Sequence, residues 1–332
     1  MPESTPQTNG RLTSALFVFI CALMSAHFAM IFCRVGADSV NMQDYIAGKL
    51  ATPYQWRCLM MPVFQFLLDA LTPERMSYLP RLTPPFLKDP TRLSFFLVNG
   101  VSMFVAMLAH TAAAQALFKN VAQARLSTAV FTTTAYLVFI LNPNLPYILP
   151  YDIPALAFGG IGAWLVLSGR YLGACILLPF AVLNRETAFM TPLLLLCLLL
   201  RGHADKRAWP YLVVMGVIWM GIKLLVAQMF SHNADASEFK LTHNLVTVIK
   251  PWQWPALLPL LALALLSMRT ALLPGRVNAA GMATGLAFTA LLVVAAIAET
   301  RAFGDLIQLS ALCMTHLLIT QLRLSAREAM PA

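Results

Sequence analysis

Residues 12–33 read LTSALFVFICALMSAHFAMIFC, a run of 22 residues without Asp, Glu, Lys or Arg. As an α-helix this run would be about 33 Å long, enough to cross the hydrocarbon core of a bilayer. The run is also too long for the apolar core of a signal peptide. We therefore expect a permanent signal-anchor helix, preceded by a short cytoplasmic tail at 1–11.

The whole chain shares this apolar character. Of 332 residues, 59% are hydrophobic and 11% are charged, whereas soluble domains carry about a quarter charged residues. Six cysteines are present without a CxxC pair, which indicates neither a zinc site nor a disulfide framework. This composition excludes a soluble enzyme, a disordered chain and a disulfide-stapled secreted domain.

Apolar runs divide the chain into about ten candidate membrane segments. We place them at 12–33, 92–118, 126–142, 153–169, 171–184, 187–200, 209–230, 254–268, 279–298 and 304–322. The expected fold is all-α, a polytopic transmembrane helical bundle formed by a single integral-membrane domain over 1–332. The short segments 171–184 and 187–200 are either a tight helical pair or one long kinked helix, and the two alternatives give the later segments opposite orientations.

Charge favours the helical pair with the N-terminus in the cytoplasm. The net charge of +9 is then explained by basic residues that hold loops inside, and no nucleic-acid partner is expected. The short inner loops and both tails, including 323–332, hold eleven Lys and Arg, and the short outer loops hold four. On this topology most of the acidic residues lie on the outer side.

The segment 34–91 would be the first extracytoplasmic loop. Residues 59–68 are apolar but too short to span, so we expect an interfacial helix there. Five prolines within 72–90 predict an irregular segment.

Two carboxylates stand just after the first membrane segment. Asp38 or Asp44 could act as a general base on a hydroxyl acceptor. Each could instead be a solvated loop acid or a helix N-cap.

Two arginines lie in contexts that suit an anionic lipid. Arg57 follows Tyr54-Gln55-Trp56, and its guanidinium could hold two phosphate oxygens or serve as an interfacial anchor. Arg185 and Glu186 separate the two short segments. Because adjacent residues on a helix do not face each other, we expect them to serve different partners.

The remaining candidates stand later in the chain. Glu299 and Arg301 stand at the outer end of the ninth segment, with Asp305 nearby, and Asp152 begins the fourth segment as a site residue or an N-cap. Lys223 lies inside the seventh segment, where it either snorkels or pairs with an acid.

The order of these clusters resembles small bacterial members of the C-type (GT-C) superfamily of integral-membrane glycosyltransferases. The resemblance rests on an acid-bearing first outer loop and on Tyr54-Gln55-Trp56-Arg57-Cys58-Leu59, Pro62, Asp152, Arg185-Glu186-Thr187 and Glu299-Thr300-Arg301. The paired acids of the Asp-x-Asp kind found in such enzymes are absent, and Asn41 stands where an acid is expected.

The resemblance implies an inverting transfer of a sugar from a polyprenyl-phosphate-linked donor to a hydroxyl acceptor at the outer face of a bacterial inner membrane. It implies Asp44, or Asp38, as the base, with no metal or other cofactor. Three arginines would hold the donor phosphate, and four further residues would bind or orient the substrate. The first set is Arg57, Arg185 and Arg301, and the second is Tyr54, Asp152, Glu186 and Glu299.

Two other functions fit the residues. A transporter or lipid flippase would place charged groups near the midplane beside broken helices. A non-catalytic membrane subunit would use the same arginines only to bind headgroups.

Overall fold

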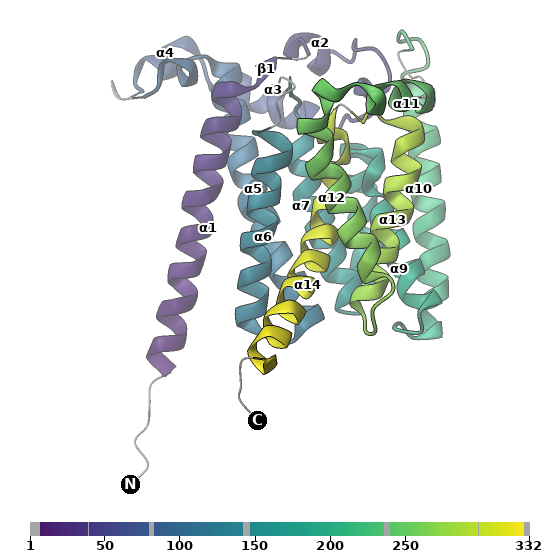
Figure 1. Cartoon of the computed structure of the whole chain (residues 1–332). Coiled ribbons are helices and arrows are strands. Elements are labelled where there is room, and N and C mark those ends of the chain that lie inside the picture. Colours follow the sequence, from purple (N-terminus) through teal and green to yellow (C-terminus); the bar gives the residue numbers. More distant parts are fainter. Residues whose placement is uncertain are drawn as a thin grey trace.

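The computed structural model describes residues 7–38, 40–79, 83–141, 147–235, 240–297 and 299–328. Long helices stand side by side, and a layer of short helices crosses one end of them (Figure 1). The long helices are α1 (Gln7–Val35), α5 (Pro90–Phe118), α6 (Val121–Phe139), α7 (Asp152–Leu167), α8 (Tyr171–Asn184), α9 (Met190–Leu200), α10 (Trp209–Met229), α12 (Trp254–Thr270), α13 (Val277–Val294) and α14 (Ile307–Glu328).

Five helical stretches within the described residues are long and apolar enough to cross a membrane. They are Thr13–Val35, Pro90–Phe118, Lys206–Met229, Val277–Val294 and Arg301–Leu322. The prediction of an all-α membrane bundle is therefore confirmed as a fold class. That all ten long helices cross the bilayer stays a prediction.

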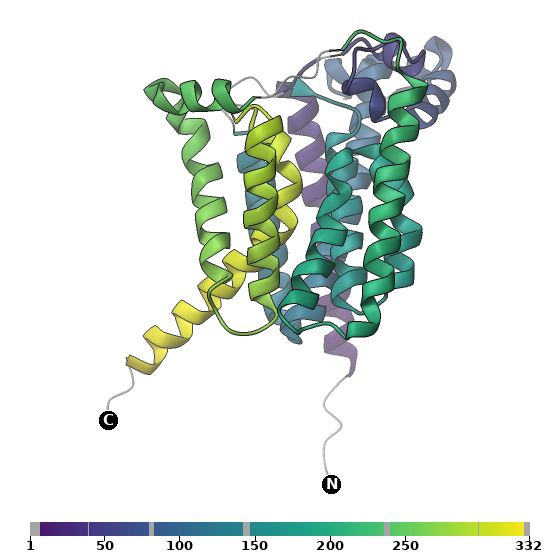
Figure 2. The same cartoon turned by 90° about the vertical axis from the view of Figure 1, so that its right-hand side faces the viewer.

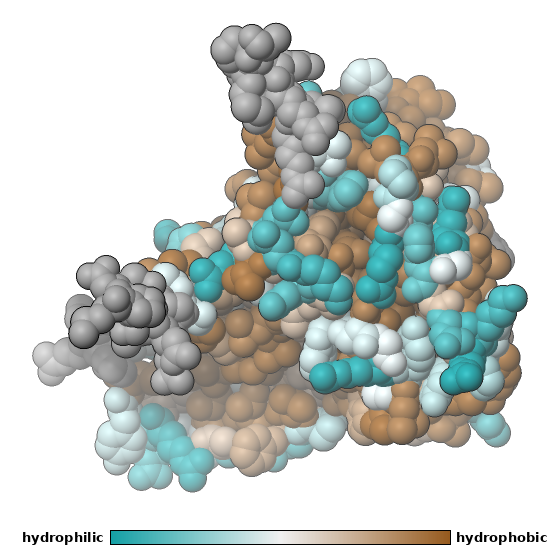
Figure 3. All heavy atoms as spheres, turned by 90° about the horizontal axis from the view of Figure 1, so that it is seen from below, coloured by the Kyte–Doolittle hydropathy of each residue, from teal (hydrophilic) through white to brown (hydrophobic). Residues whose placement is uncertain are grey.

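The two ends of the bundle differ. The start of α1 and the end of α14 lie at one end, which we call the termini end. The short helices α2 (Met42–Ile46), α3 (Met61–Ala70), α4 (Pro73–Ser77) and α11 (Leu241–Ile249) lie at the other, which we call the loop end (Figures 1 and 2). Viewed from the termini end, hydrophilic residues gather on the end face and hydrophobic residues surround them (Figure 3). A polar end face inside an apolar rim is typical of a bundle that stands upright in a bilayer.

The expected first loop contains more helix than the sequence predicts. The interfacial helix expected at 59–68 is present as α3. The expectation of a wholly irregular 72–90 is wrong, because α4 and the 3₁₀ helix η2 (Pro85–Lys88) form within it, although residues 80–82 lie outside the described part. Both helices have proline at their first positions, where the missing N–H costs no hydrogen bond.

A short two-stranded sheet joins the first loop to the start of α7. β1 (Ala37–Asp38) pairs in parallel with β2 (Tyr147–Ile148), with Asp38 opposite Ile148. This pairing fixes the beginning of α7 at the loop end.

Helices α8 and α9 form a pair that reverses direction. Arg185 has extended backbone, with φ −163° and ψ 133°, and it ends α8 before the 3₁₀ helix η3 (Glu186–Phe189) leads into α9. After α10, Asn233 donates to the carbonyls of Gly48 (2.9 Å) and Leu50 (2.6 Å) in the first loop. Because α10 therefore ends at the loop end, α9 runs back towards the termini end, and a single long kinked helix is ruled out.

The turn between α8 and α9 lies well below the loop end of the longest helices. Helix α8 has 14 residues and α10 has 21, which gives lengths of about 21 Å and 32 Å. The indole Nε1 of Trp219 donates to the carbonyl of Glu186 at 2.9 Å. Trp219 lies ten residues before the end of α10 at Met229, so Glu186 lies about 15 Å below that end.

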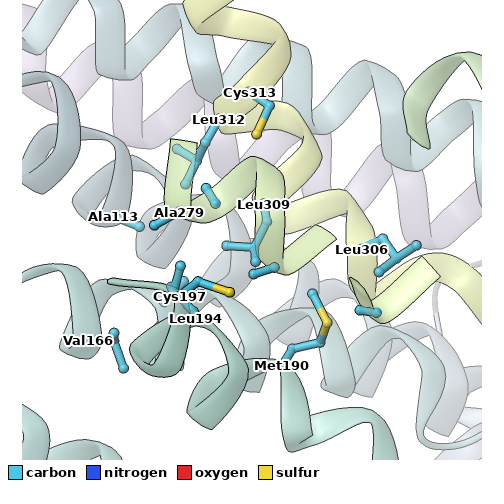
Figure 4. Packing of buried hydrophobic residues seen from close by; sticks show 14 of the residues in the cluster. Ala113, Val166, Met190, Leu194, Cys197, Ala279, Leu306, Leu309, Leu312 and Cys313 are labelled. Carbon is cyan, nitrogen blue, oxygen red and sulfur yellow. The ribbon is translucent and has the colours of Figure 1, made fainter. Parts of the chain in front are cut away.

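Small and apolar residues pack the helices around this turn. Leu194 and Cys197 of α9 lie in one buried cluster with Ala279 of α13 and Leu309 of α14 (Figure 4). A second buried cluster joins α1, α5, α6 and the first loop. Leu306 belongs to the first cluster and its neighbour Ile307 to the second, so the start of α14 lies where the two clusters meet.

Candidate functional site

A network of charged side chains connects four segments that are far apart in the sequence. Arg57 comes from the end of the 3₁₀ helix η1 (Tyr54–Trp56), Asp152 from the start of α7, and Arg185 from the α8–α9 turn. The 3₁₀ helix η6 (Thr300–Leu306) contributes Arg301 and Asp305. We call this the arginine network.

Asp152 lies at its centre. The carboxylate is fully buried and accepts a hydrogen bond from Nη1 of Arg301 at 3.2 Å, and Nη1 of Arg185 lies 3.3 Å from its other oxygen. The N-cap interpretation of Asp152 is wrong, because Tyr151 occupies the N-cap position. The carboxylate is held by the two guanidiniums, and the positive end of the α7 dipole adds to their effect.

Arg185 is buried and reaches across to η6. Its Nη2 donates to the carbonyls of Arg301 (3.4 Å) and Ala302 (3.3 Å), and its Nη1 lies 3.4 Å from a carboxylate oxygen of Asp305. The hydroxyl of Thr187 donates to the same carboxylate. The extended backbone of Arg185 makes this possible, because it turns the side chain out of the α8 helix.

Glu186 has a different partner. Arg57 donates from Nε (3.0 Å) and Nη2 (2.6 Å) to the two oxygens of Glu186, a bidentate geometry that is among the stronger ion pairs in proteins. Adjacent Arg185 and Glu186 thus serve different partners, as predicted, although the extended backbone of Arg185 rather than helix geometry separates their side chains. The guanidinium of Arg57 also lies 4.6 Å from the ring centre of Tyr151, close enough for a cation–π contact.

The first loop is folded down onto the end of α8. The hydroxyl of Tyr45 donates to the carbonyl of Arg57 at 2.6 Å, and the amide of Leu59 donates to the carbonyl of Leu183 at 3.0 Å. Burial alone would lower the pKa of Arg57, but the Glu186 carboxylate raises it well above its usual value. Arg57 is therefore a fixed positive charge.

The rim of the network is more accessible. Arg301 donates from Nη2 to Glu299 at 3.2 Å, and the Glu299 side chain is 46% exposed. The guanidinium of Arg301 lies 5.6 Å from the ring centre of Tyr147, the first residue of β2.

The two candidate bases are placed differently. Asp44 lies in the first turn of α2 and is half-buried, and within the described residues its carboxylate forms no ion pair with the arginine network. Its neighbour Tyr45 contacts Arg57, and consecutive helical side chains point about 100° apart. The backbone of Asp38 pairs beside Tyr147, whereas its side chain lies outside the described part of the chain.

Several buried donors in the arginine network and beside it have no protein partner in the described region. They are Nε of Arg185, Nε of Arg301, the hydroxyl of Tyr151 and Nε1 of Trp56. Buried polar groups are nearly always hydrogen-bonded. The arrangement therefore has the capacity to bind a group that is rich in acceptor oxygens.

Sequence reasoning placed the three arginines and Asp152, Glu186 and Glu299 among its candidates, and the structure brings them together. Tyr54 lies in η1, half-buried, and makes no side-chain hydrogen bond to the network among the described residues. Tyr151 and Trp219 were missed, because aromatic residues near membrane interfaces are too common to signal a site.

Comparisons with protein-family models, with curated proteins and with solved structures find no match to this chain.

Proposed function

We propose that the chain is an integral-membrane glycosyltransferase that moves a sugar from a polyprenyl-phosphate-linked donor to a hydroxyl acceptor, with inversion, at the loop end of the bundle. The observation that carries the proposal is the convergence of Arg57, Arg185 and Arg301 in one buried network with spare donors. We place the loop end outside the cytoplasm of a bacterial inner membrane.

The chemistry assigns the arginines to the leaving group. As the bond between the anomeric carbon and the phosphate oxygen breaks, negative charge grows on the lipid phosphate. Nε of Arg185 and Nε of Arg301 would donate to those oxygens, and fixed donors aimed at developing charge are a large part of enzyme catalysis. Both guanidiniums are already positioned by Asp152, so little reorganisation is needed.

A carboxylate of the first loop would take the acceptor proton. The acceptor oxygen then attacks the anomeric carbon opposite the departing phosphate, which gives inversion and releases polyprenyl phosphate. Asp44 is the first choice for this base and Asp38 is the second. The strand that contains Asp38 pairs with β2, and the ring of Tyr147 in β2 contacts the guanidinium of Arg301.

The arginines are tested in a reconstituted system. Purified protein in lipid vesicles is given undecaprenyl phosphate carrying a ¹⁴C-labelled hexose and a membrane extract as acceptor source, and the label transferred is counted. Loss of one donor to a developing oxyanion costs on the order of 10²–10³ in rate, so Arg185→Lys and Arg301→Lys should transfer at that reduced level. Arg201→Lys, at the termini end, is the matched control. Equal transfer by Arg185→Lys and wild type would refute the role of the network.

The base is tested by Asp44→Asn and Asp38→Asn, with Asp69→Asn as a loop control whose carboxylate accepts from the amide of Gln65, one turn earlier in α3. We expect Asp44→Asn to abolish transfer while the protein still accumulates. Loss in Asp38→Asn alone moves the base to Asp38, and activity in both variants removes a first-loop base from the mechanism.

One observation favours a second function, a flippase or transporter for a lipid-linked or anionic substrate. The α8–α9 break places charged groups level with the middle of α10, and discontinuous helices near the midplane are typical of transporters. The same vesicles separate the two functions, because a flippase moves the labelled lipid between leaflets and leaves its sugar–phosphate bond intact.

A further inference from the structure

Lys223 is a charged side chain at membrane depth. It lies on α10, one helical turn beyond Trp219 and six residues before the loop end at Met229. That position is about 9 Å below the end of the helix. Ionisable groups at such depth are costly and mark functional sites by default.

Two indoles hold its ammonium group. The Nζ atom lies 5.7 Å from the ring centre of Trp56 and 5.5 Å from that of Trp219, both within cation–π range. Among the described residues, Lys223 forms no ion pair with a carboxylate. The three arginines of the network, by contrast, each have at least one carboxylate partner.

The site lies between the lipid side of the bundle and the arginine network. The outward face of α10 is apolar and exposed, at Val213, Val214, Val217, Met220, Leu224 and Leu225. Trp219 donates to the carbonyl of Glu186, and Glu186 holds Arg57. Trp219 therefore lies between Lys223 and the arginine network. Lys223 is also close to a surface that suits acyl chains.

The loop that carries Trp56 is fastened to the end of α10. Asn233 donates to two carbonyls of residues 48–50, and the amide of Thr52 donates to the carbonyl of Ala234 at 2.8 Å. These bonds keep Trp56 over Lys223. The buried Nε1 of Trp56 has no protein partner among the described residues, so the ammonium and an indole N–H are both available as donors.

We infer that Lys223, with Trp56 and Trp219, is an anion site that takes the phosphate of a membrane lipid at the bilayer side of the arginine network. The inference rests on the proposed function, and it assigns to Lys223 the first protein contact of the donor phosphate. The apolar face of α10 would receive the lipid chain, while the ammonium and the Trp56 N–H would bind phosphate oxygens.

Binding is measured without any sugar transfer, so its failure is separate from failure of the proposed function. The probe is ¹⁴C-labelled undecaprenyl phosphate in phosphatidylcholine nanodiscs, with undecaprenol as the phosphate-free probe. A charge-assisted hydrogen bond of this kind corresponds to roughly ten- to hundredfold in affinity. We expect Lys223→Met to lose that factor, and Lys223→Arg and the control Lys250→Met to stay within roughly threefold of wild type.

A second measurement uses the wild-type protein and does not depend on how a variant folds. Acetylation of Lys223 by acetic anhydride is quantified by mass spectrometry with each lipid present. We expect undecaprenyl phosphate to protect Lys223 and undecaprenol to leave it reactive. If 10 mM inorganic phosphate alone protects Lys223, the site binds phosphate, but the inference that its ligand is a lipid is wrong.

A purely structural role makes a different prediction. If Lys223 only balances the carboxylates of the network, the two lipids will have the same effect on its acetylation, and Lys223→Met will bind undecaprenyl phosphate as tightly as the wild type does. Either result overturns the inference, even if arginine variants still abolish sugar transfer.

Discussion

At the scale of single residues, the burial of Asp152 is the feature with the largest consequence. Its carboxylate is 0% exposed and faces two guanidiniums, of which Arg185 is itself nearly fully buried. A buried ion pair is close to neutral for stability as a whole, but removal of one partner leaves the other charge buried and unpaired. Asp152 is therefore a stability determinant whatever its role with substrate.

We expect Asp152→Ala to lower the free energy of unfolding by about 3–5 kcal/mol. Glu299→Ala is the matched control, because it removes a carboxylate from the same Arg301 at a half-exposed position and should cost less than about 1 kcal/mol. Reversible unfolding in mixed micelles measures both. A similar, small effect of the two substitutions would contradict the central place of Asp152.

The bidentate pair of Arg57 and Glu186 couples the first loop to the α8–α9 turn. In a double-mutant cycle with Arg57→Met and Glu186→Gln, we expect a coupling energy of about 1–3 kcal/mol. The same unfolding assay provides the four measurements. Additive effects of the two substitutions would mean that the loop is held to α8 by its backbone and aromatic contacts alone.

At the scale of helices, close approach of α12 and α13 depends on two glycines. A Cβ at Gly281 would lie against the side chain of Thr270 and 2.7 Å from the amide nitrogen of Ala271, and one at Gly285 would lie 2.9 Å from Met268. Small residues four apart allow membrane helices to pack closely. The Gly281 position has no room for a methyl group unless the two backbones separate.

Gly281→Ala should therefore destabilise the protein by about 1–3 kcal/mol through overpacking. Gly216→Ala on α10 is the control, because nothing lies within 4 Å of a Cβ there. Thermal unfolding in detergent compares the two. If both variants unfold at the wild-type temperature, the α12–α13 contact is looser than described.

Helix α11 buries the polar residues Asn244 and Thr247 and exposes its apolar side chains. Asn244 donates to the carbonyls of Leu292 (2.8 Å) and Ala295 (2.7 Å) and accepts from the amide of Ile297 (2.8 Å). Leu245 on its outer side is 62% exposed. The helix is thus bonded to the end of α13, and its apolar side faces the surroundings of the bundle.

We expect Asn244→Leu to cost about 3 kcal/mol or more, because it leaves three backbone groups without their partner. Leu245→Ala should have little effect on stability, since its side chain packs little against the protein. Limited proteolysis at α11 reports the loosening. An equally protected helix in Asn244→Leu would show that other contacts hold α11.

At the scale of the whole molecule, the two ends of the bundle should face different compartments. Loops such as the one at Gly275 lie at the termini end, and Ser231 lies at the loop end. Of the native cysteines, Cys58 is half-buried and the other five are buried. We therefore expect the Cys58→Ser variant to react little with maleimide before a new cysteine is introduced. The introduced thiols of Gly275→Cys and Ser231→Cys should react with impermeant maleimide in vesicles of opposite orientation. Labelling of both in the same vesicles would refute the topology.

The sequence by itself determined the fold class and the orientation in the membrane that we expect for the chain. Long apolar runs must become helices in a bilayer, because each backbone N–H and C=O needs a partner and lipid offers none. The asymmetry of basic residues determined the orientation that we expect, and the adjacency of Arg185 and Glu186 determined that they serve different partners. These are local properties of a chain in a membrane.

Only the tertiary structure decided which charges meet and how deep they lie. Asp152 pairs with Arg301, 149 positions later, and no local rule links two such residues, because their separation depends on how α8 to α13 pack. The depth of Glu186 follows from the length of α8 relative to α10, and the position of Lys223 between two indoles follows from a loop bonded to the end of α10. Packing between distant segments determines these arrangements. The periodicity of one segment contains no information about which other segments it packs against.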